Sequence, residues 1–382
     1  MDFTVNRLEM LSAVQNAQSV APLASPMEIL KCVCLDAENG VLTVAATHMD
    51  AAVERKIPAD IREEGRAAVD AKLLSEMLRL LGGDTVTLET SEHCKISVTS
   101  GETEYLVSMM DGGDYPRAEI PFPEDTVTVT GIPDMAKRTA FAASRKGNDP
   151  LLTCVCLRFN GGDLNAVSTD GQRIASAKGE SKNPAMVNLL IPASSLARLA
   201  QFVTNRDEVK VGIAGKNAVF MKEGLMFSAR LMEGKYANVD GVIKALKPRF
   251  SILTNAEDMR KMVSAACTVS GEQNRFKLSF HGGKLQAVCE SECGVSKMEL
   301  EVTALSGTPS GDCWLNPAKL LESLRAQKGT MTLEMATNGL FVMRTEALTC
   351  VQMPIREPKP VTRTNPLKAA TTEADAVLKE AA

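Results

Sequence analysis

The 382-residue sequence has few aromatic residues, which make up 4% of the chain and include one Trp and three Tyr. Proteins that bind single-stranded nucleic acid by stacking its bases need such side chains, so this class is disfavoured. Basic residues are not in excess either, because the formal net charge is −4 and the isoelectric point is about 5.7. The charge argues against a surface that is basic all over, but it is compatible with basic residues gathered on one face.

Long apolar runs are also missing, and none approaches the ~18 residues that a membrane span requires. Residues 1–7 carry Asp2 and show no basic segment followed by an apolar stretch, so no secretion signal is visible. The sequence therefore predicts a cytoplasmic protein without a membrane partner. Its ten Cys, spread along the whole chain, are then expected to be reduced thiols.

Residue clusters typical of catalysis or metal binding are absent from the sequence. Cys32 and Cys34 are separated by one residue, as are Cys154 and Cys156, whereas zinc sites favour a gap of two or more. The three His do not cluster, and no His lies near the Ser168-Thr169-Asp170 segment. We therefore expect buried strand thiols, no metal, no cofactor, no catalytic residue and no enzyme activity.

The chain repeats itself with a period of about 122 residues. Residues 31–47 (KCVCLDAENGVLTVAAT) match residues 153–169 (TCVCLRFNGGDLNAVST), and FNGGDLNAV at 159–167 returns as FHGGKLQAV at 280–288. Two further sets of similar segments begin at positions 71, 193 and 318 and at positions 6, 133 and 256. Three segment types that share one period indicate three copies of one domain.

Each repeat has the pattern helix, strands, helix, strands. Met259, Met262, Val263 and Ala266 follow the spacing of a helix face, and residues 32–35 alternate with the period of a strand. The six helices are expected at 6–18, 70–81, 133–146, 192–203, 256–270 and 317–328. The fold class is therefore α+β, with two helices on one face of antiparallel sheets in each repeat. The expected domains are 1–122, 123–247 and 248–356, followed by a flexible C-terminal extension at 357–382.

These six helices carry thirteen basic residues against seven acidic ones, although the whole chain is acidic. A basic helix face inside an acidic protein suits a polyanion such as the phosphate backbone of nucleic acid. A solvated helix face, rich in Lys and Arg because both are good helix formers, is an equally open interpretation of the charge alone.

Several motifs resemble one protein family. Residues 169–175 (TDGQRIA) resemble the T-D-G-H-R-L-A motif of bacterial DNA polymerase III beta subunits, the beta sliding clamps. Residues 231–236 (LMEGKY) are similar to L-x-x-G-[RK]-[FY], and residues 353–356 (MPIR) to the closing M-P-[MI]-R. With residues 3–5 and 114–116, which also match, the chain is identified as a member of this family over residues 1–356.

The resemblance implies a processivity factor, not an enzyme: a head-to-tail homodimer whose three-domain subunits form a six-domain ring around double-stranded DNA. The helices then line the channel and bind DNA without reading its sequence. The protein would be associated with the nucleoid in the cytoplasm. The implied DNA-binding residues are Lys72, Arg79, Lys137, Arg138, Arg145, Lys146, Arg198, Arg260, Lys261, Lys319, Arg325 and Lys328. The implied dimer contact pairs Tyr105 and Val107 of one subunit with Thr268 and Val269 of the other.

The family also implies a hydrophobic pocket for short linear motifs of partner proteins. The expected partners are a replicative DNA polymerase subunit, the clamp loader complex and other proteins with clamp-binding motifs. The matching positions are Leu152, Thr169, Gly171, Gln172, Arg173, Ile174, Val242, Val351, Met353, Pro354, Ile355 and Arg356.

The sequence departs from the family pattern at several of these places. Gln172 replaces the motif His, Ala237 replaces a pocket Pro, and Gly241 replaces an Arg at the pocket rim. The loop at residues 23–25 lacks an Arg that the family uses to touch DNA. These departures leave an alternative open: a divergent paralogue that acts as a decoy or scaffold for clamp-binding peptides without efficient loading onto DNA.

Overall fold

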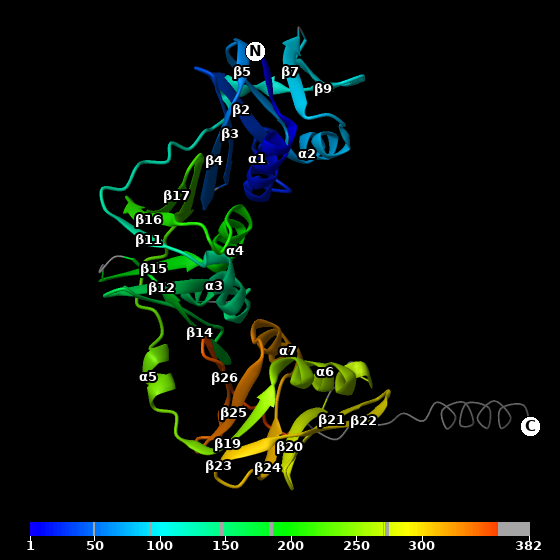
Figure 1. Cartoon of the computed structure of the whole chain (residues 1–382), viewed down its shortest axis with the longest axis vertical. Helices are drawn as coiled ribbons and strands as arrows, with labels where there is room; N and C mark the ends of the chain where they lie inside the picture. The colour runs from blue at the N-terminus through cyan, green and yellow to red at the C-terminus, as the bar shows by residue number, and fades with distance from the viewer. Residues whose placement is uncertain are drawn as a thin grey trace, which may run out of the picture. The chain divides into compact units, whose positions relative to one another are not determined.

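The computed structural model describes residues 1–48, 50–91, 93–145, 149–182, 186–269, 271 and 275–357. The chain forms two compact units (Figure 1). The first comprises residues 1–140, 145–166 and 178–236. The second comprises residues 141–144, 167–177 and the chain from residue 237 onward. Strands β13 and β14 therefore each have residues in both units.

The first half of the first unit contains two α-helices between short antiparallel strands. Its elements are β1 (Asp2–Asn6), α1 (Arg7–Val20), the 3-10 turn η1 (Glu28–Lys31), β2 (Cys32–Glu38), β3 (Val41–His48), β4 (Ala51–Pro58), β5 (Asp60–Glu63), β6 (Gly65–Asp70), α2 (Ala71–Leu80), β7 (Thr85–Ser91), β8 (Lys95–Ser100), β9 (Thr103–Ser108), β10 (Met110–Asp111) and η2 (Gly112–Asp114).

The second repeat follows the same order. Its elements are β11 (Thr126–Val129), α3 (Ile132–Thr139), η3 (Ala140–Ala142), η4 (Pro150–Thr153), β12 (Cys154–Asn160), β13 (Asp163–Thr169), β14 (Arg173–Glu180), β15 (Met186–Pro192), α4 (Ala193–Phe202), β16 (Val209–Ala214), β17 (Asn217–Lys222) and β18 (Leu225–Arg230).

One antiparallel sheet runs through both halves of the first unit. Its strand order is β10-β6-β2-β3-β4-β18-β17-β16-β11, and β4 pairs with β18 so that Val53 faces Phe227. A second sheet has the order β5-β1-β7-β8-β9. The long sheet continues from the first repeat into the second, and both repeats belong to the first compact unit.

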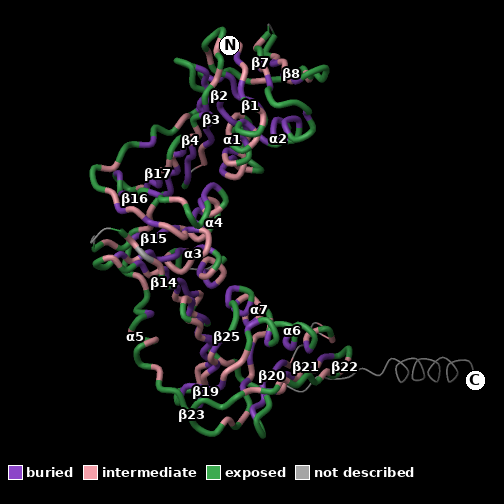
Figure 2. The backbone as a smooth tube through the Cα atoms, in the orientation of Figure 1, coloured by how far each residue is buried: buried purple, intermediate pink, exposed green. Residues whose placement is uncertain are grey.

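The helices of the first unit lie on one side of these sheets (Figure 1). Helix α1 is an example. Its N-cap Asn6 fixes where the helix begins, because the Asn6 side chain accepts hydrogen bonds from the backbone N–H groups of Leu8 and Glu9. Its face of Met10, Ala13, Val14 and Ala17 is fully buried against the sheet core. Figure 2 shows the same arrangement, with buried residues where helices meet strands.

The second unit contains the third repeat and an additional short helix. Its elements are α5 (Val239–Lys244), β19 (Pro248–Asn255), α6 (Ala256–Ala266), η5 (Cys267–Val269), β20 (Arg275–His281), β21 (Lys284–Ser291), β22 (Gly294–Glu301), β23 (Thr303–Ser306), β24 (Gly311–Trp314), α7 (Pro317–Ala326), β25 (Thr330–Ala336), β26 (Phe341–Arg344) and β27 (Leu348–Gln352).

Two sheets support α6 and α7 in this unit. One is the part β14-β27-β26-β25-β19-β23 of a nine-stranded sheet that continues beyond β14 as β13-β12-β15, and the other has the order β22-β21-β20-β24. Phe250 and Phe280 meet edge to face in the core, with ring centroids 5.0 Å apart and planes at 64°. Met259, Val263, Leu320 and other apolar residues of both helices complete this core.

The predicted α+β class, with paired helices on antiparallel sheets, is confirmed, but three details of the prediction are wrong. Every repeat begins with a strand (β1, β11 or β19) rather than with a helix. The helices expected to end at 146 and 270 end at Thr139 and Ala266 and continue as 3-10 turns. Helix α5 was not expected.

Both early helix ends are followed directly by 3-10 turns, η3 (Ala140–Ala142) after α3 and η5 (Cys267–Val269) after α6. Arg145 therefore lies beyond α3, and Lys146 lies outside the described residues, as does the extension from residue 358 onward.

Candidate functional site

Most of the predicted DNA-binding residues of the first unit reach solvent from its helices. Lys72 and Arg79 are exposed on α2, and Lys137 is exposed on α3. Arg138 and Arg198 are half-buried, and Arg138 pairs with Asp134 one turn earlier, at 3.2 Å. Arg145 is exposed just beyond α3. The helices thus present several cations on the side away from the sheets.

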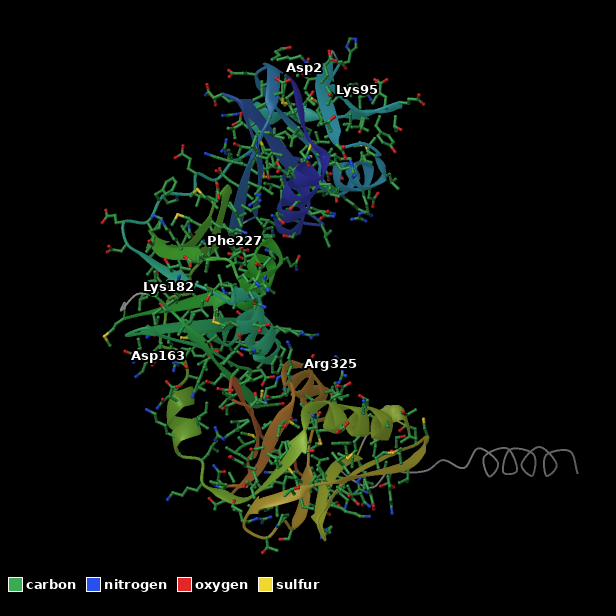
Figure 3. The ribbon with its side chains drawn as sticks, viewed as in Figure 1. Asp2, Lys95, Asp163, Lys182, Phe227 and Arg325 are labelled. Atoms are coloured by element: carbon green, nitrogen blue, oxygen red, sulfur yellow. The ribbon has the colours of Figure 1, made fainter. Side chains whose placement is uncertain are left out.

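Three of the predicted DNA-binding cations of the second unit gather where the start of α6 meets the end of α7. Arg260, Arg325 and Lys328 line a hollow of about 240 Å³ together with the first residues of α6, Ala256 and Glu257. Arg325 is labelled in Figure 3. The N-terminus of a helix favours anions, and three cations strengthen that preference. This hollow can accept a phosphate group without contacting a base.

Glu257 moderates the charge at this hollow. Its Oε1 lies 3.6 Å from Arg260 Nη2 and 3.6 Å from Lys261 Nζ. All three side chains are largely exposed, so these ion pairs contribute little to stability and can rearrange around an incoming phosphate.

Residues 169–173 form a tight turn that its own side chains stabilise. Thr169 Oγ1 donates to the carbonyl oxygen of Arg173 at 2.7 Å and accepts from the N–H of Gly171 at 3.1 Å. Asp170 Oδ1 accepts from the N–H groups of Gln172 and Arg173, each at 3.0 Å. Gly171 has a φ of +82°, which explains why Gly stands there.

Arg173 anchors this turn to the rest of the second unit. Its side chain is buried, and Nη1 donates to Glu322 Oε2 at 2.6 Å while Nε lies 3.1 Å from Asp170 Oδ2. Its Nη2 donates to the carbonyl oxygen of Phe141, and the guanidinium lies over the Phe141 ring, 5.3 Å from the centroid. Arg173 was among the predicted pocket residues, but Phe141 and Glu322 were not, because no local pattern in the sequence connects them to Arg173.

Lys319 joins the same network. Its Nζ lies 2.9 Å from Asp170 Oδ2 and 2.7 Å from Gln172 Oε1. Burial by itself would raise the pKa of Asp170, but the hydrogen bond from Lys319, those from the backbone and the charge of Arg173 outweigh it. The pKa of Asp170 is therefore lowered below its ordinary value.

The segment after β27 runs beside this turn. The Met353 N–H donates to the Gln172 carbonyl oxygen at 2.8 Å, and the Ile355 N–H donates to the Trp314 carbonyl oxygen at 2.9 Å. Met353 and Ile355 nevertheless expose 53% and 40% of their surface. Held by backbone bonds with open side chains, this segment offers apolar surface to a peptide.

The other predicted pocket residues occupy different places. Ile174 on β14 faces Val351 on β27 in the register of the two strands. Val242 is exposed on α5, and Pro354 and Arg356 follow Met353. Leu152 lies on η4 in the first unit. Within the second unit, the structure thus brings the turn and the C-terminal segment together.

The predicted dimer residues lie at or beside the open edges of two sheets. Tyr105 and Val107 belong to β9, the last strand of its sheet, and pack partly against the core. Thr268 and Val269 form η5 next to β22, which is the last strand of another sheet. Leu106, which was not predicted, is 61% exposed on the outer side of β9. The signal in the sequence is an apolar residue, Leu106, at the strand position between Tyr105 and Val107, where alternation predicts a side chain that faces away from the core.

Five buried cysteines have raised thiol pKa values. Burial is the main reason why the pKa values of Cys32, Cys34 and Cys154 are raised to about 11 and those of Cys313 and Cys350 to about 12. These thiols stay protonated at neutral pH. Within the described ranges, no three His, Cys, Asp or Glu side chains gather as a metal site would require.

None of the helices that the structure describes is both long enough and apolar enough to cross a membrane.

Two family models of known proteins match this chain. The family model for the N-terminal domain of the DNA polymerase III beta subunit matches residues 1–120, and that for its central domain matches residues 127–238. The beta sliding clamp of Bacillus subtilis is 22% identical over 380 residues, covering 93% of this chain and 100% of the relative. That of Micrococcus luteus is 27% identical over 278 residues, covering 71% and 87%.

Solved structures share the fold over almost the whole chain. The sliding clamp of Bacillus subtilis superposes with a TM-score of 0.83 at 21% identity, covering 93% of this chain and 99% of that one. The beta subunit from Streptococcus pyogenes gives 0.84 at 22% identity, covering 93% and 100%. From the two matched domains and this common fold, we conclude that the chain belongs to the DNA polymerase III beta subunit family.

Proposed function

We propose that this protein is a DNA sliding clamp, a processivity factor that encircles duplex DNA and tethers a replicative polymerase. The observation that carries the proposal is the sorting of charge. The helices carry a surplus of cations on the side away from the sheets, while the rest of the chain is acidic. Cations arranged in this way attract the phosphate backbone irrespective of base sequence.

The proposed DNA surface consists of the exposed basic residues of the helices and the hollow formed by Arg260, Arg325 and Lys328. A closed ring does not need tight contacts, because it is held on DNA by its topology. Contacts that are weak and indifferent to sequence allow it to slide. The function requires no catalytic step.

Ring closure is proposed to use the two open sheet edges. Strand β9 ends one sheet and β22 ends another, and neither pairs with a further strand on its outer side in the part of the chain that the structure describes. Pairing β9 of one subunit with β22 of the next covers both edges and produces a closed head-to-tail homodimer. Tyr105 and Val107 would then meet Thr268 and Val269. Leu106 adds apolar surface to the same edge.

The partner site is proposed to lie at the 169–174 turn and the segment from Val351 to Arg356, with Leu152 and Val242 contributing. A replicative polymerase subunit, the clamp loader and other proteins with clamp-binding motifs are the proposed partners. The clamps of Pseudomonas aeruginosa and Bartonella birtlesii have been crystallised bound to griselimycin. We propose that the same compound competes with partner peptides here.

We also propose that the chain contains three domains, at 1–122, 123–247 and 248–356, with an extension at 357–382. The order strand, helix, strands, helix, strands occurs three times and supports this division. The first two of these domains share a sheet across β4 and β18 and belong to one compact unit.

The test uses circular DNA. The full chain, loaded by a clamp loader onto nicked circular DNA, should remain bound when the salt concentration is raised. Cutting the circle should release it, because a ring held by topology slides off a free end. A protein that leaves the intact circle at high salt, or that stays on the cut DNA, is not a sliding clamp.

The scaffold alternative makes the opposite prediction. A scaffold for clamp-binding peptides binds the peptides but is not retained on circular DNA in the same assay. The similarity to sliding clamps over 93% of the chain favours the clamp.

A further inference from the structure

Lys319 lies in the first turn of α7, a helix whose cations were all assigned to the DNA surface. Its ammonium already has two partners, Asp170 Oδ2 at 2.9 Å and Gln172 Oε1 at 2.7 Å. Its side chain is 25% exposed, whereas that of Lys261 on α6 is 68% exposed. A phosphate contact would require Lys319 to give up these bonds.

Both partners of Lys319 belong to the turn that supports the C-terminal segment. Asp170 uses its other oxygen to accept from the N–H groups of Gln172 and Arg173. Gln172 uses its backbone carbonyl oxygen to accept from the N–H of Met353. The ammonium therefore holds the side chains on either side of Gly171, whose backbone conformation few other residues adopt.

The opposite end of α7 has a different environment. Arg325 and Lys328 line the basic hollow with Arg260. Among the described residues, no hydrogen bond or ion pair engages the guanidinium of Arg325. A free guanidinium is available to a phosphate, and an ammonium bound to a carboxylate and an amide is not.

We propose that Lys319 is a positioning residue for the partner-peptide site and not a DNA contact. Helix α7 is then divided by function: its first turn holds the peptide-binding turn, and its last turn serves the DNA phosphates. The inference rests on the proposed clamp function, and it identifies a residue of the partner site that neither its charge nor its position in a helix would suggest.

The test compares Lys319→Met with Arg325→Met in the full chain. Each change removes one cation from α7 and keeps a long apolar side chain, so the two variants are matched in charge. Peptide affinity is measured with a fluorescent peptide that covers the clamp-binding segment of the cognate replicative polymerase. DNA binding is measured on duplex DNA over a range of salt concentrations.

Lys319→Met should weaken peptide binding about tenfold, which corresponds to the loss of roughly 1.4 kcal/mol. It should leave the slope of log affinity against log salt unchanged. Arg325→Met should lower that slope by about one and leave peptide binding unchanged. Equal peptide affinity in the unaltered chain and in Lys319→Met overturns the inference, as does a salt slope that falls equally in both variants.

A second variant covers the case in which Lys319→Met folds poorly. Gln172→Ala removes an exposed side chain from the other end of the bond and should reproduce the loss of peptide affinity. The double variant Lys319→Met with Gln172→Ala should lose less than the sum of the two single losses. Additive losses would show that the residues act independently and would overturn the positioning role.

Hydrogen exchange provides a readout that peptide affinity does not. In Lys319→Met the amide of Met353 should exchange faster, because its acceptor on Gln172 is less firmly held. If the unaltered chain does not bind the peptide, the proposed partner site and this inference fail together. If it binds and the Met353 amide is unaffected by the change, only the inference fails.

Discussion

The backbone N–H of Met353 donates a hydrogen bond to the carbonyl oxygen of Gln172 at 2.8 Å. The two residues are far apart in the sequence, but each belongs to one of the motifs that resemble beta clamps. Gln172 is in turn bound through its side chain to Lys319. The segment after β27, the turn at residues 169–173 and helix α7 of the third repeat thus form one structural unit.

Charge reversal in the basic hollow should weaken DNA binding. Changing both Arg260 and Arg325 to Glu places two anions where phosphate is expected, so affinity for duplex DNA should fall. The slope of log affinity against log salt should decrease by about two. Lys210→Glu is the control, because Lys210 is exposed on strand β16 rather than on a helix. An equal loss in both proteins would refute the assignment of the DNA surface.

Leu106→Asp should open the ring. The side chain is 61% exposed on the edge strand β9, so the charge should leave the single subunit folded but be unfavourable once β9 is covered by a partner. Light scattering at micromolar concentration should give about twice 41.0 kDa for the unaltered chain and about 41.0 kDa for the variant.

Ile213→Asp is the control for ring opening. Ile213 is 44% exposed but lies on β16, which has paired neighbours on both sides. This variant should keep the mass of the dimer. A monomeric unaltered chain, or loss of the dimer in both variants, would contradict the proposed interface.

Asp170→Asn should lower stability at neutral pH but not in acid. The folded-state pKa of Asp170 lies below its ordinary value, so the ionised form stabilises the fold. This contribution is present above the unfolded pKa of ~3.9 and is lost as the pH falls through the folded pKa. The variant should be less stable by about 1–3 kcal/mol at pH 7. Urea unfolding at several pH values measures the difference, and a gap that does not shrink below pH ~3 would argue against this role for Asp170.

Thiol labelling should divide the cysteines into a fast and a slow group. Cys94 and Cys293 are exposed and should react at once with a thiol reagent in the native protein. Cys32, Cys34 and Cys154, whose pKa values burial raises to about 11, should react only after unfolding. The double variant Cys94→Ser with Cys293→Ser should lack the fast reaction, and its persistence there would show that the half-buried Cys267 or a buried thiol is accessible.

Local patterns in the sequence were sufficient to predict the repeats, the fold class and the positions of most of the helices. Helix α2 illustrates this, since Asp70 caps it and it spans Ala71–Leu80, within one residue of the predicted bounds at each end. Helix faces and strand alternation depend on residues only a few positions apart, so a single chain displays them directly. The alternation at residues 32–35 likewise indicated a strand.

The burial of that strand was less predictable. Val33 and Leu35 pack in the main core, while Cys32 and Cys34 pack in a separate cluster that includes Tyr115. Alternation separates the two faces of a strand but does not reveal what covers each face. The segment around Tyr115 covers one of them, and only the folded chain shows this.

The sequence by itself determined three related repeats, a fold of helices on antiparallel sheets, and an acidic chain whose helices are basic. Tertiary structure decided which strands form open edges, where the helices of the second and third repeats stop, and which cations are free. Lys319 and Arg325 occupy one helix and have the same charge sign, but Asp170, one of the two partners of Lys319, is 149 residues away in the chain. Periodicity reports short-range order, whereas the role of a charged group depends on neighbours that folding brings to it.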